Sequence, residues 1–148
     1  MGVLPGSILF ACTWNSVRSP MAEGLMKSLF GTRVFVDSAG VRSGGGRDPF
    51  AVLVMAEIGI DIGGHQPKTF DDLESDSFDM VVSLSPEAQH RAIELTRTAH
   101  CEIEFWHTLD PSIVEGNRET RLFAYREVRD GLMAKLMERF GAPRPPVV

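Results

Sequence analysis

Short apolar runs alternate with amphipathic stretches along most of this chain, and this alternation limits the possible folds more than any other feature. The runs are short enough to be buried strands, and the stretches between them carry apolar residues at helical spacing. Strands are expected at residues 7–11, 34–36, 80–84 and 103–106, and helices at residues 21–30, 49–58, 86–95 and 121–140. Strands that alternate with helices need crossover connections, which favours an α/β fold with a parallel sheet covered on both faces.

The length of 148 residues fits one domain, and no linker or repeat divides it. Residues 1–141 are expected to form that domain, and the proline-rich residues 142–148 are expected to form a flexible tail. The formal net charge of -5 argues against nucleic-acid or anionic-membrane partners, although one local site can still be positive. With two cysteines and no recognisable secretory leader, we expect a cytoplasmic location.

Parallel sheets bind ligands at the carboxyl ends of their strands, which directs attention to the loop after the first run. That loop reads Cys12-Thr13-Trp14-Asn15-Ser16-Val17-Arg18-Ser19-Pro20, with five residues between the cysteine and the arginine. Backbone N–H groups that lack partners at the start of a helix can together hold one anion. Their field also favours a thiolate, and Arg18 offers a planar fork for two oxygens of a tetrahedral oxyanion.

Three further residues fit a thiolate that accepts a phosphoryl group. Asn15 suits a left-handed backbone turn, and the Ser19 hydroxyl can donate a hydrogen bond to the thiolate. The leaving oxygen needs a proton donor, for which Asp110 is the best candidate. Pro111 follows it and biases its backbone towards an extended conformation, which fixes the direction of the carboxyl group.

Residues 8–23, which include this loop, resemble the N-terminal signature of the low-molecular-weight protein tyrosine phosphatases. That family also includes thioredoxin-coupled arsenate reductases. Weaker matches run along nearly the whole chain: Asp37-Ser38-Ala39-Gly40, Gly59-Ile60-Asp61 with His65 shortly after, the strand at residues 79–84, and Asp110-Pro111. The resemblance implies the phosphotyrosine phosphatase I-like fold, a Rossmann-like three-layer α/β arrangement with a four-stranded parallel sheet flanked by helices on both faces.

The resemblance also implies roles for individual residues. Cys12 would be the nucleophile, Arg18 the oxyanion clamp and Asp110 the general acid and then the general base. The substrate-binding loop would comprise Thr13, Trp14, Asn15, Ser16, Val17, Arg18 and Ser19. A supporting hydrogen-bond network would comprise Asn15, Ser19, Ser38 and His65. The implied reaction is hydrolysis of a phosphate monoester through a cysteinyl-phosphate, with no metal and no organic cofactor.

The chain departs from the family pattern around the expected site. Trp14 stands where eukaryotic members usually have glycine, and it either forms a wall of the site or points to solvent. Val17 replaces the second cysteine of many members, and no aromatic pair follows Asp110-Pro111. A preference for phosphotyrosine therefore stays open. The expected partners are a phosphorylated protein or a small phosphate ester, with phosphate, vanadate and arsenate as ligands or inhibitors.

Two other functions remain open at this stage. The first is arsenate reduction with an external thiol, because residues 85–92 lack the relay cysteines of thioredoxin-coupled reductases. The second is a non-catalytic phosphate-binding module. Cys101 is expected to be a packed or surface thiol, and its neighbours His100 and His107 match no zinc-ligand spacing. The sequence makes no prediction of oligomeric state.

Overall fold

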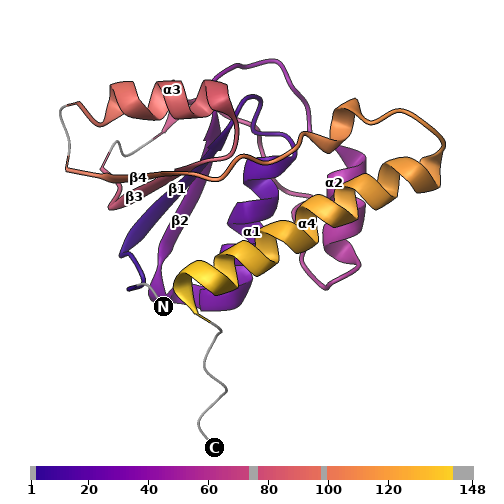
Figure 1. Cartoon of the computed structure of the whole chain (residues 1–148), viewed down its shortest axis with the longest axis horizontal. Coiled ribbons are helices and arrows are strands. Elements are labelled where there is room, and N and C mark those ends of the chain that lie inside the picture. Colours follow the sequence, from indigo (N-terminus) through magenta and orange to yellow (C-terminus); the bar gives the residue numbers. More distant parts are fainter. Residues whose placement is uncertain (1–2, 74–76, 98–99, 142–148) are drawn as a thin grey trace, which may run out of the picture.

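Four parallel strands form one sheet in the order β2-β1-β3-β4, which confirms the predicted fold class (Figure 1). The computed structural model describes residues 3–73, 77–97 and 100–141, so the expected tail at residues 142–148 lies outside the described residues. The strands are β1 (Ser7–Cys12), β2 (Phe35–Gly40), β3 (Met80–Ser83) and β4 (Glu102–Phe105). The helices are α1 (Arg18–Phe30), α2 (Pro49–Ala56), α3 (Pro86–Leu95) and α4 (Arg118–Phe140), and short 3-10 turns are η1 (Gly31–Arg33), η2 (Phe70–Asp72) and η3 (Pro111–Ile113). No helix among the described residues is both long and apolar enough to span a bilayer.

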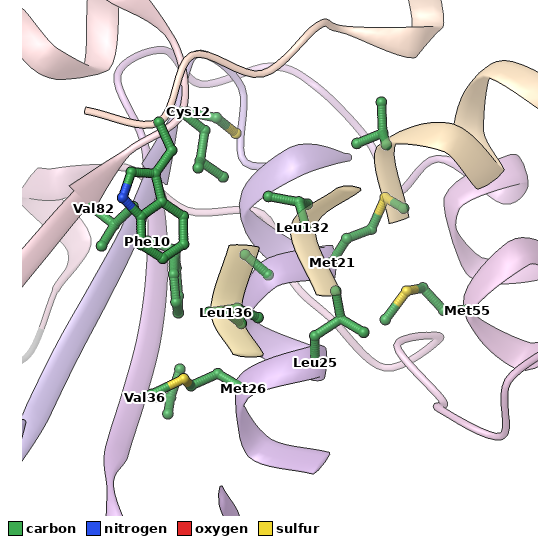
Figure 2. Close-up of a cluster of buried hydrophobic side chains, with 14 of the residues drawn as sticks. Phe10, Cys12, Met21, Leu25, Met26, Val36, Met55, Val82, Leu132 and Leu136 are labelled. Carbon is green, nitrogen blue, oxygen red and sulfur yellow. The ribbon is translucent and has the colours of Figure 1, made fainter. Parts of the chain in front are cut away.

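Helices cover both faces of the sheet, with α1 and α4 on one side and α3 on the other (Figure 1). Side chains along β1 alternate between the two faces, because the side-chain period of a strand is two. Ile8, Phe10 and Cys12 belong to the larger cluster, with side chains of α1, α2 and α4. Leu9 and Ala11 belong to the smaller cluster under α3. Figure 2 shows Cys12 at one end of the larger cluster.

Capping residues explain why two helices begin where they do. The Asn117 side chain accepts a hydrogen bond from the backbone N–H of Thr120 at 2.9 Å, so α4 begins three residues before the expected start at residue 121. Asp48 caps α2 by accepting from the N–H groups of Phe50 and Ala51 at 2.9 and 3.2 Å. Because the side-chain oxygen of an N-cap residue satisfies helix N–H groups that otherwise lack partners, these two residues fix where the helices start.

Two boundaries near the end of β1 differ from the expected ones. Helix α1 begins at Arg18 rather than at residue 21, and β2 continues to Gly40 rather than ending at residue 36. The extension of β2 follows from its register, in which Cys12 pairs with Gly40. Strand β1, which ends at Cys12, is therefore paired with β2 up to its last residue.

Candidate active site

The Cys12 side chain lies at the carboxyl end of β1 and is only 2% exposed. Its Sγ lies 2.9 Å from the Oγ of Ser19 and 3.3 Å from the backbone nitrogen of Asn15, which donates to it. Ser19 stands in the first turn of α1, so the start of the helix is fixed against the sulfur. The loop that connects β1 to α1 thus curls around Sγ.

Asn15 is fully buried and has a φ of 57°, so the left-handed conformation expected for it is present. Its Nδ2 donates to the Oγ of Ser19 at 2.8 Å and to the Oγ of Ser38 at 3.0 Å. Its Oδ1 accepts from the backbone N–H of Lys68 at 3.0 Å. One side chain therefore ties the loop to α1, to β2 and to the segment after α2.

The hydrogen-bond directions in this network follow from the donor inventory of each group. Because Asn15 Nδ2 can only donate, both serine oxygens accept from it and keep their own protons for other partners. The Ser38 hydroxyl donates to Glu23 Oε1 at 2.5 Å, and the Ser19 hydroxyl is free to donate to Cys12 Sγ. Two donors then point at the sulfur, an arrangement that stabilises negative charge on it.

His65 contacts the loop from outside through its Nε2, which lies 2.9 Å from the carbonyl oxygen of Asn15. A carbonyl oxygen only accepts, so Nε2 carries the proton. Burial lowers the pKa of His65, with the Asn15 hydrogen bond opposing that shift, so the neutral ring is favoured near pH 7. The four residues of the expected network are thus brought together around the loop.

The Arg18 and Asp110 side chains approach each other, Arg18 from the start of α1 and Asp110 from the residue before η3. Arg18 is buried, its Nη1 donates to the carbonyl oxygen of Thr108 at 3.1 Å, and its Nη2 lies 3.9 Å from Asp110 Oδ2. Asp110 Oδ1 accepts from the backbone N–H and from the hydroxyl of Ser112 at 3.0 and 2.7 Å. These two bonds occupy Oδ1, so Oδ2 is the oxygen that remains for proton transfer.

The sulfur, the guanidinium and the carboxyl group open on one cavity of about 410 Å³. The cavity is lined by Cys12, Trp14, Ser16, Val17, Arg18, Gly44, Gly45, Gly46, Arg47, Asp48, Pro49, Asp110 and Ser112. Thr13, Asn15 and Ser19 do not line it. Thr13 instead donates to Ser85 Oγ at 3.1 Å, so these three residues support the loop from behind.

Trp14 lines the mouth of this cavity and is 41% exposed. A Cβ built on Gly45 would lie 3.3 Å from Trp14 Cβ and 2.7 Å from Ser16 Oγ, so the glycine loop packs directly on the tryptophan. Of the two positions that the sequence left open for Trp14, the wall of the site is the one observed.

Seven lining residues were not among the predicted site residues, namely Gly44, Gly45, Gly46, Arg47, Asp48, Pro49 and Ser112. Asp48 could have been found from the sequence, because an aspartate followed by proline signals the start of a helix. No comparable signal marks Arg47 or Ser112 as a lining residue. Within the described ranges, no three His, Cys, Asp or Glu side chains gather as a metal ion would require.

Cys101 lies at the other end of the sheet from Cys12. It precedes Glu102, which pairs with Met80, which in turn pairs with Ile8. Cys12 is therefore about five strand residues away along the sheet, or about 16 Å at about 3.3 Å per residue. A disulfide needs Cα atoms within about 7 Å, so these two thiols cannot pair in this conformation. Burial also raises the pKa of Cys101, which disfavours its thiolate.

Comparisons with known proteins agree on one family. Residues 7–139 match the model of the low molecular weight phosphotyrosine protein phosphatases. A protein named arsenate reductase from Bacillus subtilis (strain 168) is 36% identical over 131 residues, which cover 88% of this chain and 92% of that protein. Another protein named arsenate reductase, from Shouchella clausii (strain KSM-K16), is 39% identical over 132 residues, with coverages of 87% and 91%.

Solved structures show the same fold. An arsenate reductase in the phosphate binding state has a TM-score of 0.68 and 29% identity, and covers 89% of this chain and 94% of its own. A low molecular weight protein tyrosine phosphatase from T. tengcongensis has a TM-score of 0.69 and 28% identity, with coverages of 89% and 97%. A variant of the arginine phosphatase YwlE with a phosphorylated active-site serine has a TM-score of 0.67 and 26% identity, with coverages of 89% and 95%.

Proposed function

The chain belongs to the low molecular weight phosphotyrosine protein phosphatase family, and from this premise we propose that it hydrolyses phosphate monoesters through a cysteinyl-phosphate on Cys12. The observation that carries the proposal is the meeting of three groups in one cavity. Cys12 Sγ receives two hydrogen-bond donors, and the Arg18 and Asp110 side chains, 3.9 Å apart, line the same cavity. These are the parts that a thiolate mechanism needs, a nucleophile, an oxyanion clamp and an acid.

In the first step, an electron pair of the Cys12 sulfur forms an S–P bond in line with the leaving group. The bond between phosphorus and the ester oxygen breaks, and Asp110 gives its proton to that oxygen through Oδ2. The loop N–H groups and Arg18 hold the three equatorial oxygens as charge redistributes. Ser112 keeps Asp110 in position by bonding to its other oxygen.

In the second step, water attacks the phosphorus of the cysteinyl-phosphate. The Asp110 carboxylate takes a proton from that water, the P–S bond breaks, and the Cys12 thiolate and phosphate are released. Asp110 therefore acts first as acid and then as base, and it returns to its protonated form after each cycle. The substrate that we propose is a phosphorylated protein or a small phosphate ester, and the location that we propose for the reaction is the cytoplasm.

Arsenate reduction is a second candidate, and the names of the curated relatives favour it more than they favour hydrolysis. In this reaction, Cys12 would form an S–As bond with arsenate as water leaves. An external thiol would then attack Cys12 Sγ, which releases arsenite and leaves a mixed disulfide, and a second external thiol would restore the cysteine. Both electrons come from the two external thiols, because Cys101 lies too far away to supply one.

One protein sample separates these candidates. Hydrolysis of p-nitrophenyl phosphate that disappears in Cys12→Ser supports the phosphatase, and arsenite production that depends on glutathione supports the reductase. The variant is expected to keep its affinity for inorganic phosphate, since the loop N–H groups and Arg18 are unchanged. Activity of Cys12→Ser on the aryl ester would exclude the cysteinyl-phosphate mechanism. Phosphate binding with neither activity would indicate the non-catalytic module.

A further inference from the structure

Besides Arg18, three arginines lie in or next to the wall of the cavity: Arg47 lines it, and two more stack on Phe50, which follows the lining residue Pro49. Arg47 lines the cavity, and its Nη1 donates to the carbonyl oxygen of Gly63. Arg118 and Arg121 stand at the start of α4, and their guanidinium carbons lie 5.4 and 4.7 Å from the centre of the Phe50 ring. The N-terminal part of α4 lies beside α2, which begins at this rim (Figure 1).

Stacking and hydrogen bonds hold the two helix arginines near the rim. Phe50 follows Pro49, a lining residue, and its ring meets the edge of Tyr125 at 5.5 Å between centroids. The Tyr125 hydroxyl donates at 2.7 Å to Asp48, another lining residue. Arg121 is one turn before Tyr125 on the same face of α4. The start of α4 is therefore tied to the cavity wall by its own side chains.

The charges of these arginines have no carboxylate partner within the ranges that the structure describes. None of the three comes within 4.0 Å of an Asp or Glu oxygen there. Glu119 shares the first turn of α4 but faces Arg126 at 3.7 Å. Other arginines of the chain do contact carboxylates at 3.0 Å or less, namely Arg42, Arg126, Arg129 and Arg139.

The location of these charges does not follow from the needs of the fold. Cations at a helix N-terminus are unfavourable, because the aligned peptide dipoles already make that end positive. The formal net charge of the protein is -5, so these three arginines are local positive charges on an acidic molecule. A positive field beside a phosphate site attracts ligands with additional negative charge and speeds their arrival.

We propose that Arg47, Arg118 and Arg121 bind carboxylates that flank the phosphorylated residue, so that the natural substrate is an acidic phosphopeptide segment of a protein. This inference rests on the proposed function, because the phosphate itself must occupy the Cys12 loop. Arg118 and Arg121 stack on Phe50 and do not line the cavity. A ligand must therefore extend beyond the cavity to reach them, which a peptide does and a small phosphate ester does not. Three extended residues span about 10 Å, enough to carry carboxylates past the rim.

The test compares two phosphotyrosine peptides of equal length, one flanked by Asp and Glu and the other by Asn and Gln. The wild-type protein is expected to show a kcat/KM about tenfold higher for the acidic peptide, the scale of a few exposed ion pairs. This ratio is expected to approach one in Arg118→Gln/Arg121→Gln, because glutamine keeps helix propensity but removes the charge. Salt of about 1 M, which shortens the screening length to about 3 Å, is expected to have the same effect.

Arg33→Gln is the matched control, since Arg33 also stacks on an aromatic ring, 5.5 Å from the centre of Phe30. It precedes β2 and so lies at the opposite end of the sheet from the cavity. This variant is expected to keep the tenfold ratio. Loss of the ratio in the control, or its persistence in the double variant, would overturn the proposal. Equal kcat/KM values for the two peptides in the wild type would also overturn it.

The outcome for p-nitrophenyl phosphate distinguishes failure of this proposal from failure of the proposed function. Hydrolysis of that ester without any peptide preference overturns the rim proposal alone. If the ester is not hydrolysed, the rim is tested by calorimetric binding of both peptides to Cys12→Ser. Tighter binding of the acidic peptide that is lost with Arg118→Gln/Arg121→Gln supports the rim, and equal binding overturns it. Tighter binding of a small bisphosphate than of the acidic peptide overturns the assignment to a peptide.

Discussion

Asn15 holds the loop after β1 from three directions. Its side chain bonds to Ser19, Ser38 and the backbone of Lys68, and its carbonyl oxygen accepts from His65. The same residue adopts a left-handed conformation, which costs a residue with a Cβ about 1 kcal/mol unless local bonds offset it. The Ser19 hydroxyl that faces Cys12 Sγ is therefore positioned by Asn15, a residue that does not line the cavity. The charge of the proposed nucleophile depends on that position.

Two substitutions of Asn15 separate the contribution of its side-chain hydrogen bonds from the cost of its left-handed backbone. Asn15→Ala removes the side-chain bonds and retains the strained φ, and we expect a loss of about 3 kcal/mol in the free energy of unfolding. Asn15→Gly removes the same bonds without the conformational strain, so about 1 kcal/mol of that loss should return. Urea denaturation measures both values. Equal stability of the two variants would show that the strain of the left-handed φ is no larger than the extra conformational entropy that glycine loses on folding.

At the scale of elements, the end of β2 supports the loop from behind. Gly40 pairs with Cys12, and a Cβ at position 40 would lie 2.8 Å from the backbone nitrogen of Asn15 and 2.8 Å from the carbonyl carbon of Trp14. Backbone atoms cannot move aside as a flexible side chain can, so only glycine fits between strand and loop. The family motif that ends in this glycine thus has a steric reason.

Gly40→Ala is expected to displace the loop and to reduce kcat/KM for an aryl phosphate by at least about 100-fold, as a shift of about 1 Å in catalytic groups does. Gly131→Ala is the matched control, because nothing lies within 4 Å of a Cβ built there and Gly131 does not line the cavity. Steady-state kinetics of both variants give the comparison. Wild-type activity in Gly40→Ala would show that the loop tolerates displacement.

A second contact between elements joins α4 to the start of α2, where the Tyr125 hydroxyl donates to Asp48. Burial and the neighbouring Asp48 carboxylate raise the pKa of Tyr125 well above its usual value near 10. The folded protein therefore keeps this phenol protonated at pH values where the unfolded chain releases its proton. Linkage then predicts that stability is fully present below pH 10 and falls as the pH rises above it.

Tyr125→Phe is expected to lose about 1 kcal/mol of stability at neutral pH with the hydrogen bond, and to lose the alkaline decrease that comes from this residue. Chemical denaturation between pH 8 and pH 11 measures both effects. Tyr125 is the only tyrosine of the chain, so its ultraviolet titration in the folded protein reports this group alone. Ionisation near pH 10 in the folded protein would contradict the expected shift.

Element boundaries show what a sequence pattern can and cannot predict. Helix α3 begins and ends at the residues that Pro86 and the apolar spacing predict, because its start signal is local. The start of α1 was predicted too late, since its first turn is the anion loop and carries few apolar residues at helical spacing. Arg47 and Ser112 were not predicted as lining residues because no local motif marks them as such: Arg47 reaches the cavity from the loop before α2, and Ser112 from η3.

At the scale of the whole molecule, the parallel sheet separates the two thiols. The carboxyl ends of the strands carry Cys12, and Cys101 stands at the amino end of β4. Sequence spacing was enough to propose Cys12 as the nucleophile because its loop is continuous, whereas the separation of the two cysteines depends on strand register. Any redox cycle on Cys12 must therefore draw its second thiol from another molecule.

Cys101→Ser is accordingly expected to leave both aryl phosphate hydrolysis and glutathione-dependent arsenate reduction within about twofold of the wild type. Treatment of the wild type with arsenate is expected to yield no disulfide between Cys12 and Cys101. Non-reducing peptide mapping by mass spectrometry detects such a bond. A disulfide between Cys12 and Cys101 would require the sheet to rearrange. It would contradict the expectation and support an internal thiol relay.

The central claim, that one sulfur carries the phosphoryl group, is tested most directly by trapping the intermediate. The wild-type protein is mixed with p-nitrophenyl phosphate, quenched in acid within a turnover and digested for mass spectrometry. We predict a phosphoryl adduct on the peptide that contains Cys12, and its accumulation in a burst that matches the release of p-nitrophenol. Steady hydrolysis of the ester with no adduct on Cys12 at any quench time would contradict the account.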